Sequence, residues 1–189
     1  MKRPLFFFAS LFAFAGCQSL GHIEKSQSIK PDESIFVFGA SPEQYFYNVI
    51  PVELKPKGYR TVRIAALYGR PEGGYLVGKG VAGEHLALST VKATKDKESI
   101  AGPRYTPCGG KRGLVFRAEP GKVLYITHAT YSFEGNLLVP RFHDDFESAR
   151  RYIDENFPNL RGKLERGPYE LIPALAECVI TVPITIPGR

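Results

Sequence analysis

The short motifs that mark many catalytic sites are missing from this sequence of 189 residues. It contains neither the H-E-x-x-H pattern of zinc-binding histidines nor a C-x-x-C pair of cysteines. It also lacks G-x-S-x-G, the turn that presents a nucleophilic serine in many hydrolases. We therefore predict no metal site, no cofactor and no catalytic residues, and we favour a non-enzymatic role.

The apolar run at the N-terminus is too short to cross a membrane. Residues 5–15 cover about half of the roughly 20 residues that a membrane-spanning helix needs. The run follows two cations, Lys2 and Arg3, and is followed by the small residue Gly16. This order is typical of a secretion signal, so we expect residues 1–16 to be a signal peptide and the remainder to be exported.

The first of the three cysteines stands directly after this signal. The segment Phe14-Ala15-Gly16-Cys17 resembles the lipobox of bacterial lipoproteins, in which the cysteine is acylated and the preceding residues are removed, although leucine is usual at the position of Phe14. The resemblance implies acyl chains such as palmitate on Cys17 and an anchor in the bacterial cell envelope. Gln18, which is not aspartate, implies the outer membrane. The alternative is an ordinary signal peptide beside an incidental cysteine.

The other two cysteines, Cys108 and Cys178, form an even pair in a compartment that normally oxidises thiols. We expect a disulfide between them. It would close a loop of about 70 residues, for which the chain-entropy model gives about 4 kcal/mol of stabilisation. The alternative is two separate buried thiols, since cysteine packs well as a small hydrophobic residue.

Positive charge is spread thinly along the chain. Lys2 and Arg3, in the expected signal, supply two of the six units of formal net charge. Elsewhere the cations form isolated pairs, such as Lys111-Arg112 and Arg150-Arg151. A nucleic-acid surface needs a stripe of cations with stacking aromatic residues, so we expect no nucleic-acid partner.

The composition favours strands and turns. The chain has 19 glycines and 15 prolines, together with many tyrosine, phenylalanine, valine and threonine residues. Apolar or alternating segments predict strands at residues 35–38, 45–54, 59–68, 75–78, 86–93, 114–119, 122–131, 137–139 and 178–186. We predict a mainly-β protein in which a single domain, residues 35–189, forms an antiparallel β-sandwich with one surface helix near its C-terminal end.

Residues 17–34 are polar and lack sustained apolar periodicity. We expect a flexible tether that holds the domain roughly 20 to 25 Å from the anchor, on the root-length scaling of such linkers. His22 lies in this segment and is expected to be solvated.

Two proline-containing segments give specific strand predictions. Pro120-Gly121 fits the central positions of a type II turn, so the strands on either side should be antiparallel neighbours. Pro51 interrupts the strand at residues 45–54 and should place that part at an edge or a bulge.

A helix is predicted at about residues 145–157. Phe146, Ala149, Ile153 and Phe157 recur at helical spacing, and charged residues fill the opposite face. Asp144-Asp145 should supply the N-cap oxygen, and Pro158 should end the helix.

Only weak patterns point to chemistry. Residues 78–83 match the G-x-G-x-x-G nucleotide fingerprint, but an alternating strand follows where a helix is required, so we interpret the glycines as a turn or bulge. His128 shares a face with Leu124 and Ile126 and is expected to lie in the sheet. His143, Asp144 and Asp145 could bind a metal or form part of an acid–base pair, although the two aspartates also have a capping role. His85 beside Glu84 is a weaker candidate.

The predicted function is a lipid-anchored binding or assembly module of the cell envelope. The aromatic residues Tyr45, Phe46, Tyr47, Tyr131 and Phe133 are candidates for a shallow groove that binds an envelope protein or a glycan. Two alternatives remain: a secreted hydrolase with a site near His128, His143 and Asp144, and a structural subunit of an envelope complex.

Overall fold

The computed structural model describes residues 21–62 and 65–178. The expected signal peptide, the lipobox and all but the first residue of the strand predicted at 178–186 lie outside this part of the chain.

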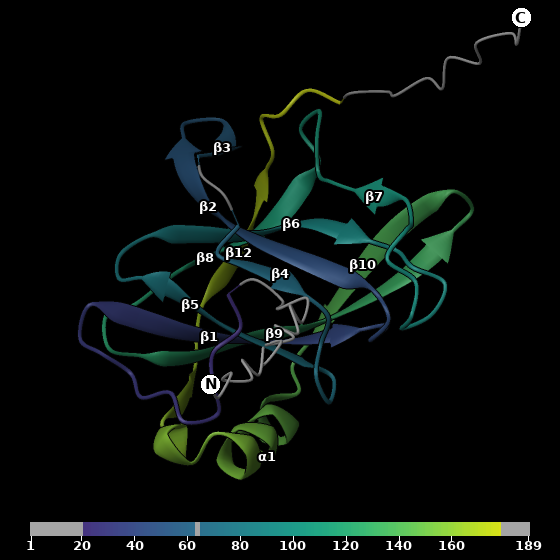
Figure 1. The fold of residues 1–189 in the computed structure, drawn as a ribbon. Helices are drawn as coiled ribbons and strands as arrows, with labels where there is room; N and C mark the ends of the chain where they lie inside the picture. The colour runs from purple at the N-terminus through teal and green to yellow at the C-terminus, as the bar shows by residue number, and fades with distance from the viewer. Residues whose placement is uncertain (1–20, 63–64, 179–189) are drawn as a thin grey trace, which may run out of the picture.

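Two β-sheets pack face to face and form a mainly-β sandwich, as predicted (Figure 1). The first sheet has the order β10 (Leu137–His143), β9 (Val123–Glu134), β1 (Glu33–Ser41) and β5 (Tyr75–Val81), and β11 (Leu164–Arg166) also pairs with β9. The second sheet has the order β12 (Tyr169–Pro173), β8 (Arg112–Arg117), β6 (His85–Lys92), β2 (Phe46–Lys55) and β3 (Gly58–Thr61). Two short strands extend it, β4 (Leu67–Gly69) on β2 and β7 (Arg104–Tyr105) on β6. Most pairs are antiparallel, but β1 and β11 each run parallel to β9.

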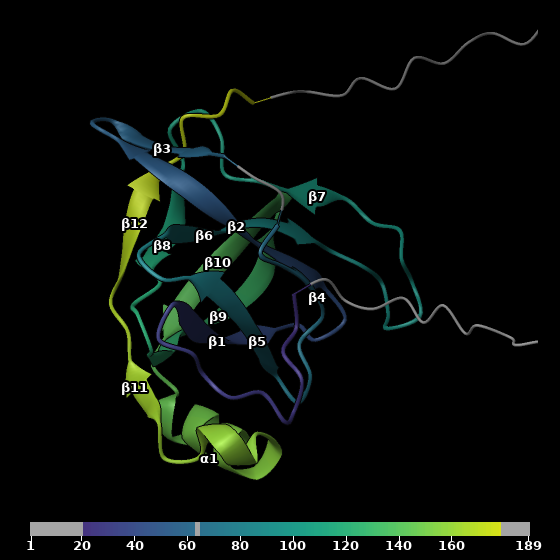
Figure 2. The ribbon, with the colours of Figure 1, turned by 60° about the vertical axis from the view of Figure 1, so that its left-hand side comes forward.

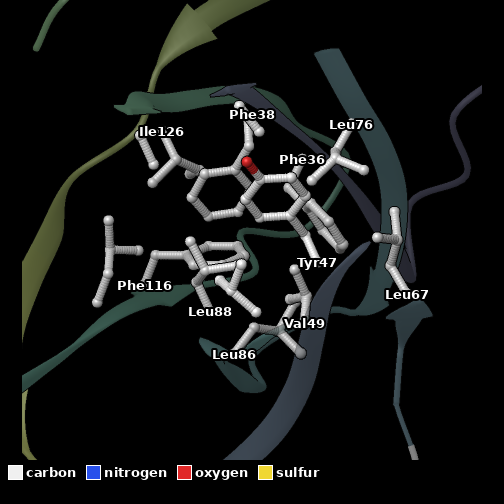
Figure 3. Packing of buried hydrophobic residues seen from close by; sticks show 14 of the residues in the cluster. Phe36, Phe38, Tyr47, Val49, Leu67, Leu76, Leu86, Leu88, Phe116 and Ile126 are labelled. Carbon is white, nitrogen blue, oxygen red and sulfur yellow. The ribbon is translucent and has the colours of Figure 1, made fainter. Parts of the chain in front are cut away.

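Aromatic rings fill the space between the two sheets (Figure 3). Phe36 and Phe38 of β1 project towards the second sheet, where both meet Phe116 of β8 edge-on, with ring centroids 5.4 and 5.2 Å apart. All three are at most 2% exposed. Burial of each such side chain contributes about 1.5 to 3 kcal/mol, so these rings are a main source of stability.

The other face of the first sheet is covered by the predicted helix, α1 (Phe146–Asn156). Ala149, Ile153 and Phe157 are buried against Ile35 and Val37 of β1, which confirms the apolar stripe. Because β1 is covered on both faces, its central residues 35–38 form a continuous apolar run and do not alternate with polar residues. Figure 2 shows α1 at one end of the molecule, with β7 and β3 at the other.

The helix ends where the sequence predicts, but its N-terminus differs. Pro158 begins a single 3₁₀ turn, η1 (Pro158–Leu160). At the N-terminus, Asp144 Oδ1 accepts a hydrogen bond from the Phe146 N–H at 3.3 Å. The side chain of the N-cap residue itself, Asp145, makes no capping hydrogen bond.

The turn at Pro120-Gly121 forms, but the predicted pairing of its flanking strands is wrong. Gly121 has a φ of +65°, and the Lys122 N–H bonds to the Glu119 carbonyl, as a type II turn requires. The two strands, β8 and β9, nevertheless belong to different sheets and face each other across the core. The local hairpin is instead β9–β10, which is closed at Gly135 and Asn136.

The glycines at residues 78–83 serve packing and a turn. A Cβ at Gly78 would lie 2.5 Å from the Phe36 ring, and one at Gly80 would lie 2.7 Å from Leu86. Gly83 has a φ of +87° in the turn between β5 and β6. These contacts support the interpretation of the pattern as a turn, and no helix N-terminus follows it.

The described part of the predicted tether lies against the domain. The Ile23 N–H bonds to the Val77 carbonyl at 3.4 Å, and Ile23 and Ile29 pack on the cluster beneath α1. His22 is not solvated as expected: its Nε2 is buried without a hydrogen-bond partner, and burial lowers the pKa of the imidazole. From Gly21 onwards, this segment therefore packs on the domain.

Candidate binding groove

A groove of about 540 Å³ opens between the two sheets. One wall is β10, the last strand of the first sheet in the described part of the chain, and the other consists of β7, β8 and the loop between them. Its apolar lining includes Val91, Tyr105, Leu114, Tyr131, Leu138 and Phe142. A groove of this size and lining is typical of a site that holds a small ligand or a short peptide segment.

The groove exists because the second sheet is incomplete at this point. β6 pairs with β8 only as far as Leu88, and with the two-residue strand β7 only at Val91 and Lys92. Ser89 and Thr90 therefore lie between the two ladders, and the adjoining apolar residues are left without a covering strand. On the opposite wall Pro140 lies in an edge strand, where its missing N–H costs little.

Three exposed cations line the groove: Arg104, Lys111 and Arg112. None of them forms an ion pair with a carboxylate among the described residues, whereas other surface cations do, such as Lys122 with Glu165 at 2.7 Å. Among the described residues of the lining, Glu177 is the one acidic side chain. The groove therefore combines apolar walls with an uncompensated positive charge.

The predicted disulfide is present, and it lies in the groove wall that β7, β8 and the loop between them form. Cys108 and Cys178 are bonded with their Cα atoms 5.1 Å apart, so the alternative of two separate thiols is wrong. The N–H groups of Gly109 and Gly110 also bond to the carbonyls of Ala176 and Ala174. The loop after β7 is thus fixed to the segment after β12, and Cys108 lines the groove directly.

Of the predicted groove aromatics, Tyr131 lines this groove and Phe133 lies beside it, in contact with the lining residue Tyr105. Tyr131 lines the groove, and burial raises the pKa of its hydroxyl. Phe133, 48% exposed, contacts Tyr105 edge-on with ring centroids 5.7 Å apart. Tyr45 and Tyr47 instead belong to the core.

The edge position predicted for Pro51 is wrong because β2 is an interior strand, although its pairing with β6 carries the predicted kind of irregularity, a register shift between Asn48 and Val49. The strand pairs with β6 on one side and with β4 and then β3 on the other. Pro51 falls between the β4 ladder, which ends at Val49, and the β3 ladder, which begins at Val52. The missing N–H of proline is tolerated there without an edge position.

The histidine candidates come together on the opposite face of the first sheet. The rings of His128 and His143 stack with centroids 4.6 Å apart. The carboxylate nearest to His128 is that of Asp145, at 3.9 Å, because Asp144 bonds to the first N–H of the helix and to Arg166. His85 lies elsewhere, on β6 of the second sheet.

Ser41 also belongs to this cluster, although no sequence pattern pointed to it. Its Oγ lies 3.4 Å from Nε2 of His128, which is 87 positions away in the chain. Among the described residues, no three histidine, cysteine or acidic side chains are placed to hold a metal ion.

Comparison of the chain with protein-family models, curated proteins and solved structures finds no match. Within residues 21–62 and 65–178, no helix has the length and apolar character needed to cross a membrane.

Proposed function

We propose that this protein is a lipid-anchored binding module of the bacterial cell envelope, and that its ligand occupies the groove between β10 and the β7–β8 loop. The supporting observation is the groove itself, with its apolar walls and three cations that have no carboxylate partner within residues 21–62 and 65–178. Its ligand carries negative charge beside apolar groups. A segment of an envelope protein with acidic and apolar side chains fits this description, and it fits better than a neutral glycan because the cations then gain partners.

The packed N-terminal segment supports a position close to the membrane. If Cys17 carries the lipid, only residues 18–20 separate it from the part of the chain that contacts the domain. Four steps of extended chain span at most about 14 Å, at the usual 3.3 to 3.6 Å per residue. The domain is then held beside the membrane surface, closer than a flexible 17-residue tether would place it, and it meets partners within the same envelope layer.

The anchor is tested by replacing Cys17. The thiol is the only acceptor for the lipid next to the cleavage motif, so Cys17→Ser should abolish lipid labelling and leave the protein unprocessed or release it from the membrane. Cell fractionation and labelling with a tagged fatty acid measure both effects. A serine variant that is labelled as strongly as the parent excludes the lipobox interpretation.

The groove is tested by photo-crosslinking in intact cells. A benzophenone amino acid at Leu138, inside the groove, should capture a defined envelope protein. The same amino acid at Val81, which is 56% exposed on β5, serves as the matched control and should not. Reversal of the groove charge in Arg104→Glu/Arg112→Glu should reduce capture at Leu138 at least tenfold.

Two outcomes contradict the proposal. Equal capture at Leu138 and Val81 shows that the groove is not the contact surface. Capture that survives charge reversal excludes an acidic ligand. A single partner recovered in equal amount with the protein, under all growth conditions, instead favours the structural-subunit alternative.

A further inference from the structure

The outer face of the first sheet carries a cluster of reactive side chains beside the first turn of α1. Ser41 lies at the end of β1, with its Oγ 3.4 Å from Nε2 of His128. The second ring nitrogen, Nδ1, lies 3.9 Å from Oδ2 of Asp145. The hydroxyl, the imidazole and the carboxylate thus lie in the order that an activated serine nucleophile requires. Nε2 faces the hydroxyl, and Nδ1 faces the carboxylate.

The fold makes room for the imidazole and holds it. A Cβ at position 39 would lie 2.3 Å from Nδ1 of His128, so only glycine leaves space for the ring. His143 stacks on one side, and Tyr75 contacts the ring edge-on with centroids 6.3 Å apart. Only 16% of the His128 side chain is exposed. Packing therefore limits the ring to a narrow range of orientations.

The electrostatic environment suits a general base. Burial and, to a smaller extent, His143 lower the pKa of His128, while Asp145 raises it by less. The imidazole is consequently neutral at pH 7 and has one nitrogen available as an acceptor. Nδ1 is buried without a hydrogen-bond partner, and a proton on it faces Asp145. That tautomer leaves Nε2 to accept the proton of Ser41.

Tyr75 orients the carboxylate. Its hydroxyl donates to Oδ2 of Asp145 at 3.4 Å, and the Asp145 N–H donates to the hydroxyl of Tyr125 at 2.8 Å. Burial and the nearby Asp145 carboxylate raise the pKa of Tyr75 to about 12, so it remains a donor. Asp145 is thus free of helix capping and directed towards the imidazole.

We propose that Ser41, His128 and Asp145 form a nucleophilic site that hydrolyses activated carboxylic esters. Oγ of Ser41 attacks the ester carbonyl carbon while its proton passes to Nε2 of His128. The bond from that carbon to the leaving alkoxide oxygen breaks, the proton moves from His128 to the alcohol, and an acyl-serine remains. Water then attacks the acyl carbon and gives its proton to His128, and the bond to Oγ breaks. Oγ regains the proton, the carboxylic acid leaves, and Asp145 stabilises the imidazolium in both halves.

Thr130 competes for the serine hydroxyl. Ser41 Oγ donates to Thr130 Oγ1 at 3.1 Å, so the hydroxyl has to rotate towards His128 before it attacks. This site lies on the opposite face of the first sheet from the groove, and it does not depend on the proposed binding function. Ser41 is partly exposed and His143 beside it is exposed, so the site borders solvent.

The test uses the full-length protein with two probes, p-nitrophenyl acetate and a fluorophosphonate. The parent should release p-nitrophenol and carry the fluorophosphonate on Ser41, located by mass spectrometry of its peptides. Ser41→Ala should lose both signals. His128→Gln should slow both reactions about 100-fold or more, the smallest usual effect of losing a general base. The parent rate should rise with pH through an inflection below 6.5.

Matched variants separate reactivity from stability. Ser132→Ala removes an exposed serine from the same strand as His128 and should retain full labelling. Thr130→Val should retain or increase the rate, because it frees the serine hydroxyl. Circular dichroism checks that each variant is folded. The proposal is overturned if the folded parent carries no probe on Ser41, or if folded His128→Gln reacts as fast as the parent.

Discussion

The two ends of the sandwich are closed in different ways. At one end α1 covers the first sheet with Ala149, Ile153 and Phe157, and the segment that contains Ile23 and Ile29 fills the remaining apolar surface. At the other end no helix covers the sheets within the described residues, and the chain is tied by the Cys108–Cys178 disulfide. Burial of apolar side chains thus covers the sheet beneath α1, while a covalent link ties the chain at the other end, where the groove opens. The two ends therefore differ in what holds them: apolar burial beneath α1 and a covalent link beside the groove.

The largest expected effect on stability comes from removing the Cys108–Cys178 disulfide beside the groove. The disulfide joins residues 70 positions apart, and the chain-entropy model gives such a bridge about 4 kcal/mol. Cys108→Ser/Cys178→Ser should therefore lower the free energy of unfolding by about that amount. Urea denaturation of the oxidised parent and the double variant measures it. A loss below about 1 kcal/mol would show that the open end does not depend on its bridge.

The next largest effect on stability should come from the apolar residues that α1 buries against the first sheet. Ile153 is fully buried on the inner face of α1, and Ile153→Ala should lower the free energy of unfolding by about 3 kcal/mol through lost transfer free energy and the cavity that remains. The exposed Glu155 on the same helix provides the control, since Glu155→Ala should change stability by no more than about 0.5 kcal/mol. Crosslinking at Leu138 should be unchanged in both variants. Loss of crosslinking in folded Ile153→Ala would show that the two ends are coupled.

A smaller effect should appear on acidification, through two histidines outside the groove. Burial lowers the pKa of both His22 and His128 below the ordinary value of 6.5. The unfolded chain therefore binds protons first as the pH falls. Their contribution to stability is complete above pH 6.5, decreases as the pH falls below it, and is lost once the pH passes the folded values. Thermal unfolding between pH 7.5 and 5 should show this decrease, and His22→Gln/His128→Gln should reduce it. An unchanged slope in the double variant would contradict the assignment.

Local sequence patterns were sufficient for the elements that depend on neighbouring residues. The spacing of Phe146, Ala149, Ile153 and Phe157 predicted α1, because helical periodicity is a property of the segment alone. The turn at Pro120-Gly121 was likewise predicted, since proline and glycine fix its two φ angles. The even pair of cysteines in an expected export compartment predicted the disulfide.

Long-range packing decided the remainder. The turn chemistry at Pro120-Gly121 reverses the chain but does not select a sheet, and β8 and β9 separate because their apolar faces meet across the core. The segment from Gly21 is polar by composition, yet Ile23 and Ile29 suffice to hold it once the surface beneath α1 exists. In the same way the groove arises where β6 loses its neighbour, and Ser41 meets His128 only because β1 and β9 pair in parallel. By itself the sequence determined the periods and turns of single segments, whereas the sites depend on contacts between distant segments that form only when the whole core assembles.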